Sequence, residues 1–276
     1  MLYVSIVIYN KKMSDVLTRY SATRLLERHG EEKTKIIIVD NSDEAYAKGD
    51  MEELSKFVAT HGIAYINNGK NLGLSKAYNK AIEWAVHDSH DITSDFLMFL
   101  DDDTDITYDY MREIYKRHKE LALENDMTGT NVITGLIESG GKPMSPVKEF
   151  TFNYKVSNCI TEPGEYQDIC CISSGMAVRL SALEKVGGCD ETLFLDMIDY
   201  TLLYNLSKHD LNRVSVVNAR IEQSFSGREK QSREEAMKRY EIYKKDFLRY
   251  CEITGKSKTY GDMHLLKRRI AMEIKN

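Results

Sequence analysis

The chain has 276 residues, of which 42% are hydrophobic and 29% charged, a composition typical of a soluble globular protein with one large domain or one domain plus an appendage. Residues from Arg228 onward carry 14 Lys and Arg against 8 Asp and Glu, whereas the first 227 residues carry 24 against 35. The acidic body speaks against nucleic acid as the main ligand, no segment has the length of a membrane span, and five cysteines without Cys-x-x-Cys spacing predict reduced thiols in a cytoplasmic protein.

The first part of the chain alternates between predicted strands and predicted helices. Short runs of branched apolar residues predict the strands, and apolar residues at helical spacing predict the helices. The strands are Leu2–Ile8, Lys35–Val39, Ile63–Ile66 and the run from Phe96, and the helices are Ser14–His29, Asp50–His61 and Leu74–His87. This alternation predicts an α/β fold with parallel strands and right-handed crossovers.

Polar residues follow each of these strands directly. They are Asn10, Asp40, the loop 67–73 and the acidic run Asp101–Asp103. The carboxyl ends of parallel strands meet at one edge of a sheet, and open α/β folds bind their ligands there. The sequence therefore predicts a ligand site built from these four segments.

The acidic run at the end of the fourth strand contains the densest group of charges. Four carboxylates lie within five residues, at Asp101, Asp102, Asp103 and Asp105. In an extended chain Asp101 and Asp103 point to the same side, with Asp102 turned away. Paired carboxylates suit a hard cation such as Mg²⁺ or Mn²⁺, which usually bridges the protein to substrate phosphates. The alternative interpretation is a solvated acidic turn.

The rest of the body is less regular. Helices are predicted at Thr107–Glu124, at Ser181–Val186 and from Asp199 to about His209, and strands at Thr130–Ile137, Glu149–Val156, Ile169–Val178 with a kink at Gly175, and Arg213–Val217. The sequence contains no internal repeat, low-complexity tract or linker, and the region of Gly227 is the only plausible domain boundary.

The basic tail contains two apolar stripes at helical spacing. The first is formed by Ala236, Tyr240, Tyr243, Phe247 and Cys251, and the second by Met263, Leu266, Ile270 and Ile274, beside Lys267–Arg269. We expect two amphipathic helices packed on the body. The alternative is that this tail attaches the protein peripherally to the anionic inner face of the plasma membrane.

Five stretches of the sequence, in register, resemble family 2 glycosyltransferases of the GT-A fold. They lie at Ser5–Asn10, Ile37–Ser42, Asn68–Asn79, Phe99–Asp103, and Ser174–Gly175 through Gly187–Glu191 to Asp199. The resemblance is closest to the rhamnosyltransferase-like branch that builds bacterial surface polysaccharides. It implies a Rossmann-like, mostly parallel sheet flanked by helices over residues 1–227, with a nucleotide-binding half of about 1–105 and an acceptor half of about 106–227. Residues 228–276 then form a basic amphipathic helical extension.

The same resemblance implies how the donor is bound. Asp40 would hold a uracil or thymine base, and the loop 67–73 would cover the nucleoside. Asp101 and Asp103 would bind the Mn²⁺ or Mg²⁺ that holds the diphosphate. The full set of nucleotide-binding residues implied is Tyr9, Asn10, Asp40, Asn68, Asn71, Gly73, Asp101 and Asp102.

On the acceptor side, Asp199 aligns with the carboxylate that serves as catalytic base in the family. Asp190 and Glu191 would contact the acceptor. The residues themselves leave alternatives: Asp196 is close enough to be the base, Asp199 could cap the helix that follows, and Asp190–Glu191 could form an N-cap pair.

The implied reaction is an inverting transfer from a UDP- or dTDP-sugar to a glycan or lipid-linked acceptor in bacterial cell-surface polysaccharide synthesis. A metal-bound diphosphate leaves without protonation, so one carboxylate that takes the acceptor proton is enough. Three positions depart from the family pattern. Thr201 and Asn205 stand where the family usually has Asp and Arg, and the stretch from Gln223 to Gly227 lacks a His that often completes the metal site.

Two other functions compete with this interpretation. A non-catalytic protein that binds nucleotide sugars is kept open by the three departures. A metal-dependent phosphatase or phosphotransferase would use Asp101 as nucleophile, but such enzymes usually have Thr or Val where Asp105 stands.

Overall fold

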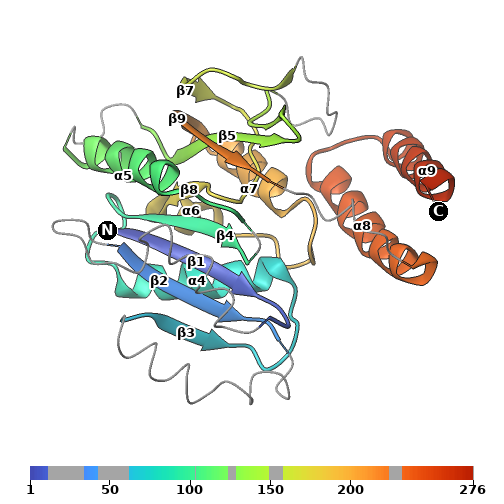
Figure 1. Ribbon diagram of the computed structural model, residues 1–276, viewed down its shortest axis with the longest axis horizontal. Helices are drawn as coiled ribbons and strands as arrows, with labels where there is room; N and C mark the ends of the chain where they lie inside the picture. Colours follow the sequence, from blue (N-terminus) through green and yellow to red (C-terminus); the bar gives the residue numbers. More distant parts are fainter. Residues whose placement is uncertain are drawn as a thin grey trace.

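The computed structural model describes residues 1–11, 34–42, 62–102, 104–123, 129–148, 158–223 and 232–275, with side chains described to residue 273. The predicted helices Ser14–His29 and Asp50–His61, the predicted strand Glu149–Val156 and the predicted metal ligand Asp103 lie outside these residues. In the described part of the chain, nine strands form one mixed sheet in the order β3-β2-β1-β4-β8-β5-β9-β7, with β6 paired to β5 (Figure 1).

Four parallel strands form one side of this sheet, as the alternation of elements predicted. They are β1 (Leu2–Ile8), β2 (Thr34–Asp40), β3 (Ala64–Asn67) and β4 (Phe96–Asp101). Side chains alternate across each strand, so Tyr3 and Val7 enter one core cluster while Val4 and Ile6 enter the cluster on the other face. Because both faces are covered, the polar residues at the strand ends are confined to the edges of the sheet.

Two helices cover the two faces of these strands. Helix α4 (Leu74–Asp88) packs Ala77, Tyr78 and Ala81 into the first cluster, and α5 (Tyr108–Leu123) packs Tyr110 and Ile114 into the second. Both agree with the predicted helices to within a residue or two at each end.

The second part of the chain adds mostly antiparallel pairings. Its strands are β5 (Val132–Ser139), β6 (Lys142–Ser145), β7 (Gly164–Gln167), β8 (Ala177–Arg179) and β9 (Arg213–Glu222), and its helices are α6 (Leu180–Val186) and α7 (Ile198–Lys208). Strand β8 joins the two parts, because it is antiparallel to both β4 and β5, whereas β9 is parallel to β5.

The prediction of a strand over Ile169–Val178 with a kink at Gly175 is wrong for most of its length. Only its last two residues belong to a strand, and residues 173–176 form a turn in which the Met176 N–H donates to the Ser173 carbonyl at 2.8 Å. Gly175 has a left-handed φ of 83°, and a Cβ there would lie 2.8 Å from the Tyr110 hydroxyl oxygen. This turn brings Ser173 and Ser174 to the end of β4.

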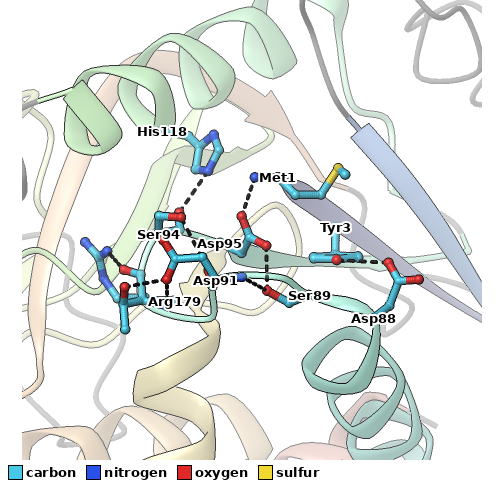
Figure 2. Close-up of polar contacts among 10 residues, drawn as sticks. Met1, Tyr3, Asp88, Ser89, Asp91, Ser94, Asp95, His118 and Arg179 are labelled. Atoms are coloured by element: carbon cyan, nitrogen blue, oxygen red, sulfur yellow. Dashed lines mark hydrogen bonds and ion pairs between the residues drawn. The ribbon is translucent and has the colours of Figure 1, made fainter.

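A polar cluster closes the amino ends of β1 and β4, at the edge opposite the predicted site (Figure 2). Asp95 accepts a hydrogen bond from the Ser89 hydroxyl at 2.6 Å and pairs with the amino group of Met1. His118 donates from Nε2 to the Ser94 carbonyl at 3.2 Å, and burial lowers its pKa to about 4. The imidazole is therefore neutral and structural.

The tail folds into α8 (Arg233–Ile253) and α9 (Lys258–Lys275), which lie on the side toward which β1 and β4 point (Figure 1). Tyr243, Phe247 and Cys251 of α8 belong to the same core cluster as the sheet, which confirms packing for the first stripe. For the second stripe that prediction is wrong, since Met263, Leu266 and Ile270 are 55%, 59% and 48% exposed. None of the helices in the described ranges has the length and apolar character needed to cross a membrane.

Candidate active site

The loops after β1, β2 and β3 meet at the carboxyl edge of the sheet. The Asn10 N–H donates to the Ser42 hydroxyl at 2.8 Å, the Asn41 N–H donates to the Ile8 carbonyl at 2.9 Å, and the Asn68 N–H donates to the Asp40 carbonyl at 2.9 Å. The structure therefore brings together the predicted residues Asn10, Asp40 and Asn68 by backbone contacts.

Asp40 is buried at this edge, with both carboxylate oxygens engaged. Oδ1 accepts from the Ser42 N–H at 2.8 Å, and Oδ2 accepts from the Tyr65 hydroxyl at 2.7 Å. Burial, together with the Asp40 carboxylate, raises the pKa of Tyr65 above its ordinary value, so its hydroxyl stays a donor. These two contacts fix the orientation of the carboxyl group.

Asn41 organises the loop 67–73, a role that the sequence reasoning missed. Its Oδ1 accepts from Asn68 Nδ2 at 2.8 Å and from the Leu72 N–H at 3.2 Å. Its Nδ2 donates to the Gly73 carbonyl at 3.1 Å and to Asn71 Oδ1 at 3.3 Å. One buried amide thus holds both ends of the loop that carries the predicted nucleoside contacts. Its position directly after Asp40 was the available signal.

The acidic run does not continue as a strand beyond Asp101. The Thr104 N–H donates to the Asp101 carbonyl at 3.3 Å. The predicted pairing of Asp101 with Asp103 lies outside the described residues. Asp101 accepts from the Tyr78 hydroxyl at 3.0 Å and from Ser174 Oγ at 2.5 Å. Asp102 turns toward β1, where it binds Lys11 Nζ at 2.7 Å and the Tyr9 N–H at 3.3 Å.

The donor chemistry of this corner fits a hard divalent cation. Asp101 supplies carboxylate oxygens, and Ser174, which donates to Asp101, also accepts from Nε2 of the buried Gln223 at 3.3 Å. The Oε1 atom of Gln223 has no hydrogen-bond partner. The described residues alone contain no group of three His, Cys, Asp or Glu side chains that could hold a metal. Water and diphosphate oxygens commonly complete such sites.

Asp199 lies in the first turn of α7, half-buried beside this corner. Its Oδ1 accepts from the Tyr200 N–H at 2.8 Å, and its Oδ2 accepts from the Ser173 N–H at 3.3 Å. Loss of hydration raises its pKa to about 6, with the charges of Asp101 and Asp196 adding to the rise against the two hydrogen bonds. A carboxylate with this pKa is ionised at neutral pH and is a stronger base than an ordinary aspartate.

The other acidic residues predicted for the acceptor side are tied into the protein. Asp196 forms a two-point ion pair with Arg239, at 2.5 and 2.7 Å, which favours Asp199 as the base. Asp190 accepts from the Thr192 N–H at 2.9 Å and pairs with Arg249 at 3.0 Å. Glu191 is exposed and accepts from Asn79 Nδ2 at 3.1 Å.

Two of the positions that depart from the family pattern contain a buried polar atom without a partner. The Thr201 hydroxyl, two residues after Asp199, makes no hydrogen bond, and neither does Gln223 Oε1. The side chains at both positions are therefore buried, polar and uncharged.

A family model described as glycosyl transferase family 2 matches residues 3–187. The dTDP-rhamnosyl transferase RfbF of Shigella flexneri is 23% identical over 224 residues, which cover 79% of this chain and 69% of that protein. The structure is similar to the mannosyltransferase PcManGT from Pyrobaculum calidifontis in complex with GDP-Man and Mn²⁺, with a TM-score of 0.58 and 14% identity over 91% of this chain and 64% of that one.

A further similar structure is TarS of S. aureus, with a TM-score of 0.54 and 15% identity over 91% of this chain and 39% of that one. The chain thus spans less than two thirds of both solved structures, which at these identities show the GT-A fold. The family model covers well over half of the chain, at the carboxyl-edge loops and strands described above. The chain belongs to glycosyl transferase family 2.

Proposed function

We propose that this protein is an inverting glycosyltransferase that moves a sugar from a UDP- or dTDP-sugar to a glycan or lipid-linked acceptor in bacterial surface polysaccharide synthesis. The turn at Ser173–Ser174 is the observation that carries the proposal. The Ser173 N–H binds the Asp199 carboxylate and the Ser174 hydroxyl binds the Asp101 carboxylate. Two adjacent residues thus hold the proposed base next to the carboxylate on the diphosphate side.

The donor side of the proposal rests on the loops around Asp40. A buried, oriented carboxyl group suits the imide N–H of uracil or thymine as a hydrogen-bond donor. The loop 67–73, fixed by Asn41, would lie against the nucleoside. The name of RfbF specifies a dTDP-sugar, whereas PcManGT was solved with GDP-Man, so the choice of base is the part to be tested.

Asp101 and Asp103 would hold Mn²⁺ or Mg²⁺. When bound, such a cation neutralises charge on the leaving diphosphate. Tyr78 and Ser174 would orient the Asp101 carboxylate toward it, since each donates to one of its oxygens. PcManGT was solved with Mn²⁺, and so was GalNAc-T7, a third similar structure with a TM-score of 0.56.

In this proposal the proton of the acceptor hydroxyl passes to Asp199 in a single step. The acceptor oxygen bonds to the anomeric carbon while Asp199 takes the hydroxyl proton. The bond from that carbon to the diphosphate oxygen breaks on the opposite face of the sugar, and its electron pair leaves with the diphosphate. Attack and departure on opposite faces invert the anomeric configuration.

A nucleotide screen tests the donor assignment. We expect dTDP or UDP with Mn²⁺ to raise the thermal unfolding temperature more than ADP or GDP does, because a ligand that binds only the folded state stabilises it. Asp40→Asn should remove this preference, whereas the control Asp91→Asn, on an exposed turn at the other edge, should keep it. Equal stabilisation by all four nucleotides would contradict the base assignment.

Turnover separates the proposal from its alternatives. Release of dTDP from dTDP-rhamnose, with a product of inverted configuration by NMR, would support transfer. Stabilisation without turnover of any UDP- or dTDP-sugar would favour a non-catalytic binding protein. Release of phosphate from p-nitrophenyl phosphate would favour the phosphotransferase.

A further inference from the structure

A side chain of helix α8 holds the backbone of the segment 193–197, which leads into the proposed base Asp199. The N–H groups of Phe194, Leu195 and Asp196 all donate to the carboxylate of Asp246, at 2.9, 2.8 and 2.9 Å. Asp246 lies in the middle of α8 and is completely buried. Three consecutive N–H groups converge on one carboxylate only in a defined loop conformation, so Asp246 fixes the shape of this segment.

Two arginines of α8 add side-chain contacts to the same region. Arg239 forms its two-point ion pair with Asp196, and Arg249 donates to the Thr192 hydroxyl at 2.9 Å and pairs with Asp190. A planar guanidinium that meets both oxygens of a carboxylate fixes its direction as well as its distance.

The opposite side of the segment touches the donor loop. The Phe194 carbonyl accepts from the Leu74 N–H at 2.7 Å, and the Leu193 carbonyl accepts from the Ser75 hydroxyl. A Cβ at Gly73 would lie 2.8 Å from the Phe194 ring, so the ring and the loop 67–73 are in close contact. The segment is therefore clamped between the proposed nucleoside-binding loop and the tail.

Helix α7 starts directly after the segment 193–197. Met197 has a left-handed φ of 63°, and its carbonyl accepts from the Thr201 N–H at 2.9 Å in the first turn of the helix. Asp199 lies in that turn, three residues after the last N–H held by Asp246. We propose that Asp246 and Arg239 are positioning residues that place the Asp199 carboxylate relative to the donor; the role rests on the proposed function.

The first test measures, without any substrate, whether Asp246 places the Asp199 carboxylate. In Asp246→Asn an amide NH₂ faces backbone N–H groups, so amide exchange read by NMR should quicken at residues 194–196. It should also quicken at Ser173 and Tyr200, whose N–H groups bind Asp199. The control Lys244→Gln removes an exposed ion pair of the same helix and should leave these amides unchanged. Unchanged exchange at Ser173 and Tyr200 in Asp246→Asn would overturn the proposal.

The second test is a double-mutant cycle on dTDP release from dTDP-rhamnose with Mn²⁺. Asp246→Asn should lower kcat by about 10- to 100-fold, the effect of a displaced catalytic group, without changing KM for the donor. In the Asp199→Asn background the same substitution should have almost no effect, because it acts only through Asp199. An equal loss in both backgrounds, or none in the first, would overturn the proposal.

Arg239 provides the second variant if Asp246→Asn fails to fold. Arg239→Met should give the same pattern, and Arg239→Lys should restore only part of kcat, since Lys cannot bind both oxygens of Asp196. Failure of the proposed function looks different: the wild type then turns over no UDP- or dTDP-sugar, or Asp199→Asn has normal turnover. The exchange experiment still decides in that case whether α8 places the Asp199 carboxylate.

Discussion

Replacing Asp199 by Asn should slow transfer and, at the same time, stabilise the folded protein at neutral pH. The pKa of Asp199 is raised from 3.8 to about 6, chiefly because the side chain loses hydration. The folded state thus binds this proton more tightly than the unfolded state. Stability from this group is complete below the ordinary pKa and is lost as pH rises through about 6. At neutral pH its ionisation therefore weakens the fold.

The size of this effect follows from the two pKa values. A rise from 3.8 to about 6 corresponds to about 3 kcal/mol, at about 1.4 kcal/mol for each pKa unit. Asn removes the charge but loses one acceptor for the Ser173 or Tyr200 N–H, which costs about 1 kcal/mol. The net gain of about 2 kcal/mol raises the unfolding temperature by roughly 4 to 8 °C. Loss of a general base lowers kcat by about 10² to 10⁴.

Thermal unfolding at pH 5 and pH 8, with dTDP release measured in parallel, checks both the predicted stabilisation and the predicted loss of turnover. The stabilisation in Asp199→Asn should be present at pH 8 and fade at pH 5, where the wild-type carboxyl group takes up its proton. Wild-type kcat should fall as pH drops below about 6. A variant that is less stable at pH 8 and nearly normal in turnover would refute the reasoning. Normal turnover together with an inactive Asp196→Asn would move the base to Asp196.

Asp103→Ala should abolish metal-dependent stabilisation by dTDP without lowering the unfolding temperature of the free protein, and normal metal-dependent binding would reduce the acidic run to a turn. His118→Gln should flatten the loss of stability between pH 6.5 and about 4, worth up to about 3 kcal/mol, because the buried wild-type imidazole resists a proton that the unfolded chain accepts; an unchanged pH dependence would exclude this role. Leu266→Glu should weaken sedimentation with vesicles containing phosphatidylserine if the exposed stripe of α9 contacts membranes, and wild type that does not sediment would exclude contact. Truncation after Gly227 should cause aggregation, since it uncovers the core cluster under α8, and a soluble, active truncated protein would contradict this.

The parallel strands and the edge that carries the site were predictable from the sequence. Runs such as Leu2–Ile8 are apolar throughout because both faces are covered, and parallel order then brings Asn10, Asp40 and Asn68 to one edge. The same reasoning failed at Ile169–Val178. An apolar run predicts burial, but Ser173–Gly175 inside it forms a turn, and the Ser-Ser-Gly sequence was the signal for it.

The contacts that orient the carboxylates were beyond reach of the sequence. Tyr78 looks like any aromatic residue on the buried face of a helix, yet its hydroxyl meets Asp101. Asp246 looks like a charge on an amphipathic helix, yet it is fully buried against a segment about fifty residues earlier in the chain. Such pairings depend on the three-dimensional register of distant elements, which no local spacing encodes.

The core that α8 shares with the sheet determines which segments of this protein can be exchanged with those of its relatives in a chimera. Tyr243 and Phe247 belong to the cluster that also contains Tyr78 of α4 and Leu203 of α7. A chimera that exchanges only the segment 189–208, the proposed acceptor side, would join foreign backbone to the Asp246 carboxylate and to Arg239. Exchange of 189–253 as one block keeps those contacts matched. Swaps intended to change acceptor preference should therefore take the tail helix with the loop.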